Sequence, residues 1–328
     1  MNIENFVGNK NLIKELSSLL INTKFPHAIA LCGDKGTGKF TLAKIIAKAL
    51  VCQRNSGYAC NECMSCKKAE ENIHPDIIFP ETSGALNTYN IDTIRGIRKD
   101  AYIIPNESLK KVYIFKDIDN MQLSAQNALL KIIEEPPHHA VFIFTCESFY
   151  NILPTVRSRI QAFHVLSPND FEASDFILKA YPEFSNSNVK NAINITNGNI
   201  GKTLEILKSE ELNSLLDISQ KITMSITSPN EFNLLKLFSA ITDSKKAKII
   251  FPMITSILRK CLIYSAGIEL KNLTNNNIVK ICNTLTTDKI MLIIEEINKT
   301  EKLLKRNVNL NLLLTNLCSK FHVIAFSD

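Results

Sequence analysis

A glycine-rich loop near the N-terminus has the residue types and the spacing that bind phosphate. Gly33, Gly36 and Gly38 allow the backbone to curl so that its N–H groups converge on an anion. Lys39 ends the loop, where its ammonium group can reach phosphate oxygens as a point charge. The pattern therefore predicts a nucleotide-binding loop that opens a helix.

Two positions depart from the chemistry that nucleotide hydrolysis needs. The residue after the lysine should be Ser or Thr, whose hydroxyl binds Mg²⁺, but Phe40 occupies it. Thr41 comes one position later, about 100° further round a helix, and is a weaker candidate for the nucleotide site. Lys116 follows an apolar segment at a position where a carboxylate should hold Mg²⁺, with Asp117 after it. The loop is therefore predicted to suit ADP or ATP but not hydrolysis.

Four cysteines cluster shortly after the loop. Cys52, Cys60, Cys63 and Cys66 have the spacing C-x7-C-x2-C-x2-C. Thiolates in such tight turns can share one tetrahedral Zn²⁺, and four thiolates leave no position for a catalytic water. Disulfides are the alternative, and a reducing compartment disfavours them. We predict a structural zinc site, with His74 as the alternative ligand.

Length and composition exclude several classes of protein. A chain of 328 residues predicts two or three domains. No apolar stretch approaches the roughly 20 residues that span a bilayer, and the first residues lack the features of a signal peptide. A cytoplasmic protein without membrane contact is the expectation. The net charge of +6 is compatible with nucleic-acid binding, but a solvated basic surface is the commoner cause of such a charge.

Short apolar segments alternate with helical patterns over the first half of the chain. Strands are predicted over 27–32, 76–79, 111–115, 141–146 and 160–165. Because helical patterns lie between them, we expect a parallel sheet with helices on both faces. From Ser167 onward helical patterns dominate.

Two further segments complete a family pattern. Asn-Ala-Leu-Leu-Lys occupies 127–131, followed by Glu-Glu-Pro-Pro at 134–137, and Ser158-Arg159 comes next. With the loop and the cysteines, in this order, they resemble the delta-prime subunits of the bacterial DNA polymerase III clamp loader, members of the AAA+ superfamily, over nearly the whole chain. The ATPase (gamma/tau) subunits share these features, but they should have Thr at position 40 and Asp-Glu at 116 and 117. The departures favour delta-prime.

The resemblance implies roles for three more residues. In the family, the Ser-Arg segment projects an arginine finger into the ATP site of a neighbouring subunit, and this role falls on Arg159. The alternative is a surface or salt-bridged arginine, like Arg157. Thr145 matches the position called sensor one, and Lys202 lies near sensor two, where the ATPase subunits resemble one another in carrying arginine. Their alternatives are a threonine that satisfies a backbone group and a lysine that merely starts a helix.

The implied architecture has three domains. Residues 1–165 would form an AAA+ α/β domain with a P-loop-type parallel sheet and a zinc module at 52–66. Residues 166–212 would form a small helical lid, and 213–328 an all-helical collar for oligomerisation.

The implied function is that of a clamp-loader subunit with no ATPase activity of its own, within the DNA polymerase III holoenzyme. It would join gamma/tau and delta subunits in a hetero-pentamer and help load the sliding clamp on primer-template DNA. One alternative is an active gamma/tau-type ATPase, which ATP turnover by the isolated chain would indicate. Another is an AAA+-like scaffold that binds nucleic acid outside replication and does not associate with clamp-loader ATPase subunits.

Overall fold

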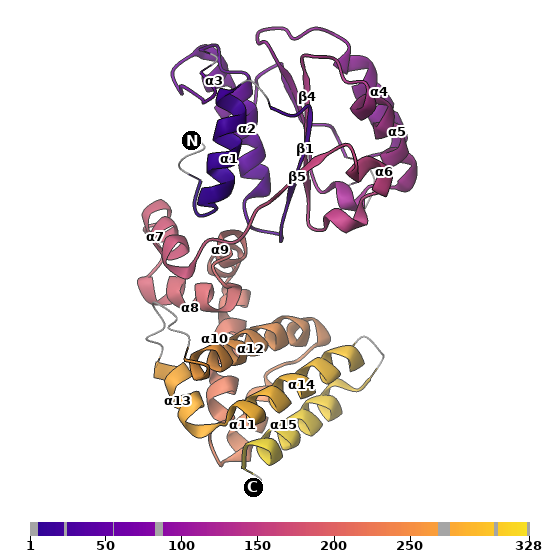
Figure 1. Cartoon of the computed structure of the whole chain (residues 1–328). Coiled ribbons are helices and arrows are strands. Elements are labelled where there is room, and N and C mark those ends of the chain that lie inside the picture. Colours follow the sequence, from indigo (N-terminus) through magenta and orange to yellow (C-terminus); the bar gives the residue numbers. More distant parts are fainter. Residues whose placement is uncertain are drawn as a thin grey trace. The chain divides into compact units, whose positions relative to one another are not determined.

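The computed structural model describes residues 6–22, 25–54, 56–82, 88–267, 276–304 and 308–326. The chain divides into two compact units, Met1–Pro168 and Asn169–Asp328. The first contains a parallel sheet with helices, and the second consists of helices (Figure 1). The predicted fold class, an α/β parallel sheet followed by a helical region, is confirmed.

A five-stranded parallel sheet with the order β2-β3-β4-β1-β5 forms the centre of the first unit. Its strands are β1 (Ala28–Cys32), β2 (Ile77–Ile78), β3 (Lys111–Phe115), β4 (Ala140–Cys146) and β5 (Gln161–His164). All residues of β1, β3 and β4 are buried, as in strands that are covered on both faces. The strand predicted over 76–79 is present as β2, which has two half-buried residues and lies at the edge of the sheet.

Helices cover both faces of this sheet. On one side lie α1 (Lys10–Ile21), α2 (Lys39–Leu50) and α3 (Met64–Glu70); on the other lie α4 (Ile91–Ala101), α5 (Leu123–Glu134) and α6 (Pro154–Arg157) (Figure 1). Alternation along β1 explains this arrangement. Ile29 and Leu31 pack in the core that contains α1 and α2, whereas Ala28 and Ala30 pack in the core that contains α4 and α5. Short 3-10 helices follow β3 and β4, η2 (Ile118–Asn120) and η3 (Phe149–Asn151).

The described residues of the second unit form one hydrophobic core, whose members extend from Ala173 to Ala325. Its helices are α7 (Asp170–Ala180), α8 (Asn186–Thr196), α9 (Ile200–Lys208), α10 (Glu210–Ser225), α11 (Glu231–Ser239), α12 (Ser244–Ser265), α13 (Asn276–Thr284), α14 (Thr287–Leu303) and α15 (Leu310–Phe326). This core crosses the predicted boundary at residue 212, and the division into lid and collar stays a prediction. Within the described residues, none of the helices combines the length and the apolar character that crossing a bilayer requires.

Candidate functional site

The glycine-rich loop joins β1 to α2 at the carboxyl edge of the sheet. Gly33 donates its N–H to the Cys146 carbonyl at 3.1 Å. A Cβ at Gly33 would lie 2.2 Å from the carbonyl oxygen of Val165, so a side chain does not fit there. Gly36 and Gly38 have φ angles of 90° and 87°, a left-handed conformation that favours glycine. All three predicted glycines are therefore required by the path of the loop.

Lys39 begins α2 and is 6% exposed. Its Nζ donates to the carbonyls of Gly33 and Asp34, the second at 2.8 Å. Thr37 donates its hydroxyl to the same Asp34 carbonyl at 2.9 Å. The ammonium group is thus held inside the loop beside the N-terminus of α2, where free N–H groups and the helix dipole favour an anion.

Phe40 occupies the position of the expected metal-binding hydroxyl, and two lysine ammonium groups lie near its ring. The ring centroids of Phe40 and Phe79 are 5.9 Å apart. Lys44 Nζ lies 4.9 Å from the Phe40 centroid, and Lys116 Nζ lies 5.9 Å from it. We call these four residues the Phe40 cluster. Mg²⁺ requires oxygen ligands, whereas this cluster supplies aromatic rings and ammonium groups; Thr41 is an exposed residue of α2 outside it.

Hydrogen bonds fix the backbone where β3 ends. The Tyr89 hydroxyl accepts the N–H of Lys116 at 2.6 Å, and burial raises the pKa of Tyr89 to about 12. Asp117 has a φ of 52°, and its N–H is accepted by Thr145 Oγ1 at 3.0 Å. Thr145 is 1% exposed. It therefore satisfies a backbone group, the alternative that the sequence offered for this residue.

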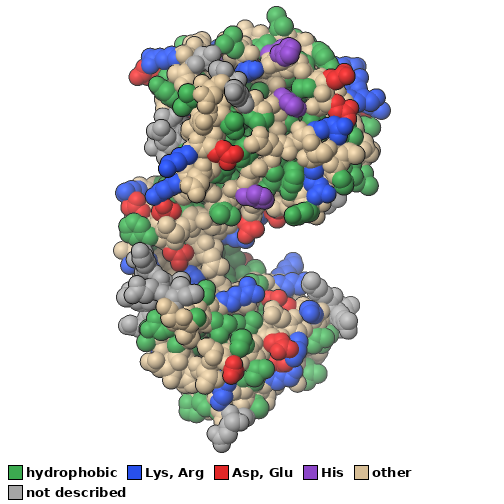
Figure 2. Space-filling view, in the orientation of Figure 1, with side chains coloured by type: hydrophobic (Ala, Val, Ile, Leu, Met, Phe, Trp, Pro, Cys, Tyr) green, Lys and Arg blue, Asp and Glu red, His purple; other side chains and the backbone are tan. Residues whose placement is uncertain are grey.

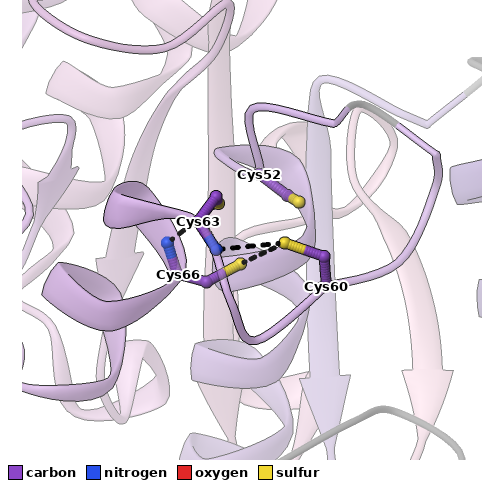
Figure 3. Close-up of side chains that lie close together, drawn as sticks. All are labelled: Cys52, Cys60, Cys63 and Cys66. Atoms are coloured by element: carbon purple, nitrogen blue, oxygen red, sulfur yellow. Dashed lines mark hydrogen bonds between the residues drawn. The ribbon is translucent and has the colours of Figure 1, made fainter.

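The four cysteines predicted to bind zinc come together (Figure 3). Cys52 follows α2, Cys60 lies in the next loop, and Cys63 and Cys66 lie at the start of α3. Their Sγ atoms lie within 4.8 Å of one another. The N–H of Cys63 donates to Cys60 Sγ, and the N–H of Cys66 donates to Cys63 Sγ, each at 3.4 Å. The cluster could bind one metal ion through four sulfur ligands, which is consistent with structural zinc.

The pKa values of two of these thiols are shifted in opposite directions. Hydrogen bonds from the N–H groups of Cys63 and Glu62 lower the pKa of Cys60 to about 6, whereas burial raises the pKa of Cys66 to about 12. A bound cation would favour the thiolate form of all four side chains. His74, the alternative ligand, is buried in the turn before β2, where its Nδ1 accepts the N–H of Asp76 at 3.1 Å. All nine cysteines are free thiols.

The cysteine module is fixed to α1 and α2. Lys48 of α2 has a side chain that is 7% exposed and pairs with Glu70 of α3 at 2.5 Å. Gly57 has a φ of 79° and packs so closely on α1 that a Cβ would lie 2.5 Å from Ile21 Cα. The module therefore packs against and pairs with α2, the helix that begins with Lys39.

Arg159, the predicted arginine finger, lies on the other face of the sheet from α2. Its Nη2 pairs with Glu134 Oε1 at 3.0 Å, and its side chain is 40% exposed. Its Nη1 donates to the Thr155 carbonyl at 2.9 Å and to Ser158 Oγ at 3.1 Å. The structure therefore keeps Arg159 at the surface, beside α5 and α6, and does not bring it to the phosphate loop of its own chain.

Two other cations singled out in the sequence, Arg157 and Lys202, have structural surroundings that the structure describes. The Arg157 guanidinium carbon lies 5.5 Å from the Tyr150 ring centroid. Its Nε is buried, with no hydrogen-bond partner among the described residues. Lys202 is exposed in the first turn of α9, where its N–H donates to Asn199 Oδ1 at 3.0 Å, so it starts a helix.

Similarity to known proteins covers both units. Residues 8–169 match the family described as DNA polymerase III, delta subunit. The DNA polymerase III subunit gamma of Buchnera aphidicola subsp. Schizaphis graminum is 32% identical over 259 residues, which are 76% of this chain and 70% of that protein. The chain belongs to the gamma/tau and delta family of DNA polymerase III clamp-loader subunits.

Two further proteins are similar, one over a shorter stretch and one at lower identity. The DNA polymerase III subunit tau of Bacillus subtilis is 38% identical over 161 residues, which are 49% of this chain and 28% of tau. A solved gamma subunit-related protein from Thermotoga maritima covers 94% of the chain at 18% identity, with a TM-score of 0.46. The identity to the Buchnera gamma subunit confirms the resemblance to clamp-loader subunits at the level of the family. These clamp-loader relatives are named gamma and tau, and the narrower assignment to delta-prime stays a prediction.

Several residues at these sites were not identified from the sequence as parts of a site. Lys44 follows Phe40 by one helical turn, so its spacing could have indicated their contact. Phe79 and Tyr89 lie far along the chain from Phe40, and no local pattern marks them. Glu134 belongs to a recognised segment, but its contact with Arg159 depends on the packing of α5 against α6.

Proposed function

We propose that this clamp-loader subunit is of the delta-prime type: it does not hydrolyse ATP, and it places Arg159 in the ATP site of a neighbouring subunit. The observation that carries the proposal is the Phe40 cluster. Phosphoryl transfer by P-loop proteins depends on a metal held by a hydroxyl and a carboxylate, and Phe40 and Lys116 replace both. Magnesium has neither ligand, and Lys116 adds a charge that repels it.

The chemistry left to this chain is therefore to act in trans. A guanidinium group can stabilise the charge that develops on a transferring phosphoryl group, at a gain of about 10³- to 10⁵-fold in rate. Arg159 is exposed and is oriented by three acceptors from α5, α6 and the turn after α6. These properties suit a group that reaches into another molecule.

The proposed complex and partners are those that the resemblance to the family implies. The chain would join gamma/tau and delta subunits in a cytoplasmic hetero-pentamer and help place the sliding clamp on primer-template DNA, with zinc as a structural ion. On the face shown in Figure 2, lysine and arginine side chains are interspersed with acidic ones in both units. DNA contact is therefore proposed on the ground of family alone.

A second candidate is a clamp-loader ATPase with unusual residues at 40 and 116. The names of the relatives, gamma and tau, favour it. ATP turnover by the isolated chain that Lys39→Ala abolishes would establish this function, and absence of turnover would exclude it.

The test of the proposed function is ATP turnover by a clamp loader reconstituted with this chain. Arg159→Ala should reduce ATP turnover at the neighbouring site by about 10³-fold or more. The total turnover of the complex should therefore fall by the part that this site contributes. Arg54→Ala is the matched control, because Arg54 is also exposed and paired with a glutamate. Equal turnover by the Arg159 and Arg54 variants, in complexes that assemble normally, would contradict the proposal.

A further inference from the structure

The guanidinium group of Arg159 has three acceptors of two kinds. The Thr155 carbonyl and Ser158 Oγ are uncharged and both bind Nη1. Glu134 Oε1 is charged and binds Nη2 at 3.0 Å. The uncharged acceptors orient the group and leave its charge intact, whereas the carboxylate also neutralises that charge.

Glu134 is placed where its charge does not stabilise its own helix, α5. Glu134 is the last residue of α5, where the negative end of the helix dipole disfavours a carboxylate. Lys131, in the same last turn, has the charge that this helix end favours. Among the described residues, the ion pair with Arg159 offsets the cost of a negative charge there.

This ion pair is also weak enough to be exchanged. The side chain of Arg159 is 40% exposed and that of Glu134 is 44% exposed. Pairs with such exposure stabilise by little, because water screens both charges. A polyphosphate presents more negative charge than one carboxylate and can form two parallel hydrogen bonds with a guanidinium group.

We infer that Glu134 is a competing counter-ion of Arg159. It restrains Arg159 until the phosphate groups of ATP bound to a neighbouring subunit displace the carboxylate. This inference rests on the proposed function of Arg159. Glu134 is a positioning residue that acts through Arg159: while the pair is closed, the finger presents little net charge to an anion, and opening the pair restores that charge. The carboxylate thereby lowers ATP turnover in complexes whose subunits are not closely docked.

The test is ATP turnover without DNA, by a clamp loader reconstituted with Glu134→Gln. Glutamine retains an oxygen acceptor for Nη2 and removes the charge, so the orientation of Arg159 is preserved. Turnover should rise by about 1.5- to 5-fold, the factor that corresponds to an exposed ion pair. The ratio of variant to wild type should fall toward one in high salt, because salt screens exposed charges.

Two further variants separate this effect from a change of structure. Glu135→Gln removes the same charge from the next residue, which is also exposed, and should leave turnover unchanged. Glu134→Gln combined with Arg159→Ala should match Arg159→Ala alone, because the effect passes through the finger.

The outcomes distinguish this inference from the function on which it rests. If Arg159→Ala lowers turnover but Glu134→Gln leaves it equal or lower, Glu134 does not restrain the finger and the inference is overturned. If Glu134→Gln raises turnover equally in the Arg159→Ala background, the effect does not pass through Arg159, and the inference is again overturned. If Arg159→Ala has no effect, the proposed function itself fails.

Discussion

Asp76 is a buried carboxylate that organises a loop by itself. It is fully buried, and its Oδ1 accepts the N–H of Asn106 at 2.6 Å. Its Oδ2 accepts the N–H groups of Glu107 and Ser108 at 2.8 and 2.9 Å, and the Ser108 hydroxyl at 2.9 Å. The turn before β2 and the loop before β3 are thus joined through one side chain.

We expect Asp76→Asn to destabilise the first unit. An amide places N–H donors against backbone N–H donors, and leaving buried donors without an acceptor costs about 2–3 kcal/mol. Urea unfolding at neutral pH measures this loss. Glu81→Gln, an exposed charge removal close in sequence, is the control and should change stability by less than about 0.5 kcal/mol.

The pH dependence of stability provides a second measurement on Asp76. Burial favours a higher pKa, but the hydrogen bonds from Asn106, Glu107 and Ser108 outweigh it and hold the pKa of Asp76 below its ordinary value. A lowered folded-state pKa stabilises the protein fully above the unfolded value, near 3.9, and this contribution is lost as the pH falls through the folded value. The free energy of unfolding of wild type should therefore exceed that of Asp76→Asn at neutral pH, and this difference should shrink below about pH 4. An advantage that persisted unchanged to lower pH would contradict this assignment.

At the scale of elements, the loop and α2 retain the parts that bind phosphate without those that bind magnesium. Any ADP bound beside Lys39 should bind equally well in Mg²⁺ and in excess EDTA, because the Phe40 cluster offers no oxygen ligand at that position. Titration calorimetry in the two buffers measures the ratio of dissociation constants.

The double variant Phe40→Thr with Lys116→Asp should acquire a magnesium dependence, since it supplies the missing hydroxyl and carboxylate. Wild-type binding that strengthens in Mg²⁺, or no ADP binding in either buffer, would show that this account of the loop is wrong.

A separate prediction concerns zinc binding by the cysteine module, which includes α3. If the four thiols hold one zinc ion, the purified chain should contain zinc at about one equivalent. Cys66→Ser should lose most of that metal and lower the midpoint of thermal unfolding, because few other apolar side chains hold the module together. Cys282→Ser, which changes a half-buried thiol outside the module, should keep its zinc. Equal zinc content in the two variants would contradict the assignment.

The same elements show what a sequence can predict here. The glycine loop and the cysteine module are local, so their spacing alone indicates phosphate and zinc chemistry, and residues 28–32 and 111–115 are apolar enough to be recognised as buried strands. Contacts that depend on packing leave no local pattern. Phe79 meets Phe40 only because β2 lies beside β3, and Glu134 meets Arg159 only because α5 packs on α6.

At the scale of the whole molecule, the two units have separate cores. The clusters on the two faces of the sheet and in the cysteine module consist of residues before 169, and the helical cluster consists of residues after it. Each unit also has a length within the range of about 50–250 residues that is usual for one domain. A unit with its own core has the main requirement for folding alone.

We therefore expect residues 169–328 to fold without the first unit. The fragment should show helical circular dichroism and one cooperative thermal transition, because its helices share one core. A fragment that starts at residue 213 is the control. It would lose Asp170, the partner of the buried Lys260 at 3.2 Å, and Ile195, whose carbonyl accepts the Ser256 hydroxyl at 2.9 Å. An unpaired buried ammonium group is costly, so this shorter fragment should melt at a lower temperature. Equal melting of the two fragments would show that the helices after 212 form an autonomous collar, and a non-cooperative 169–328 fragment would show that the helical core depends on the first unit.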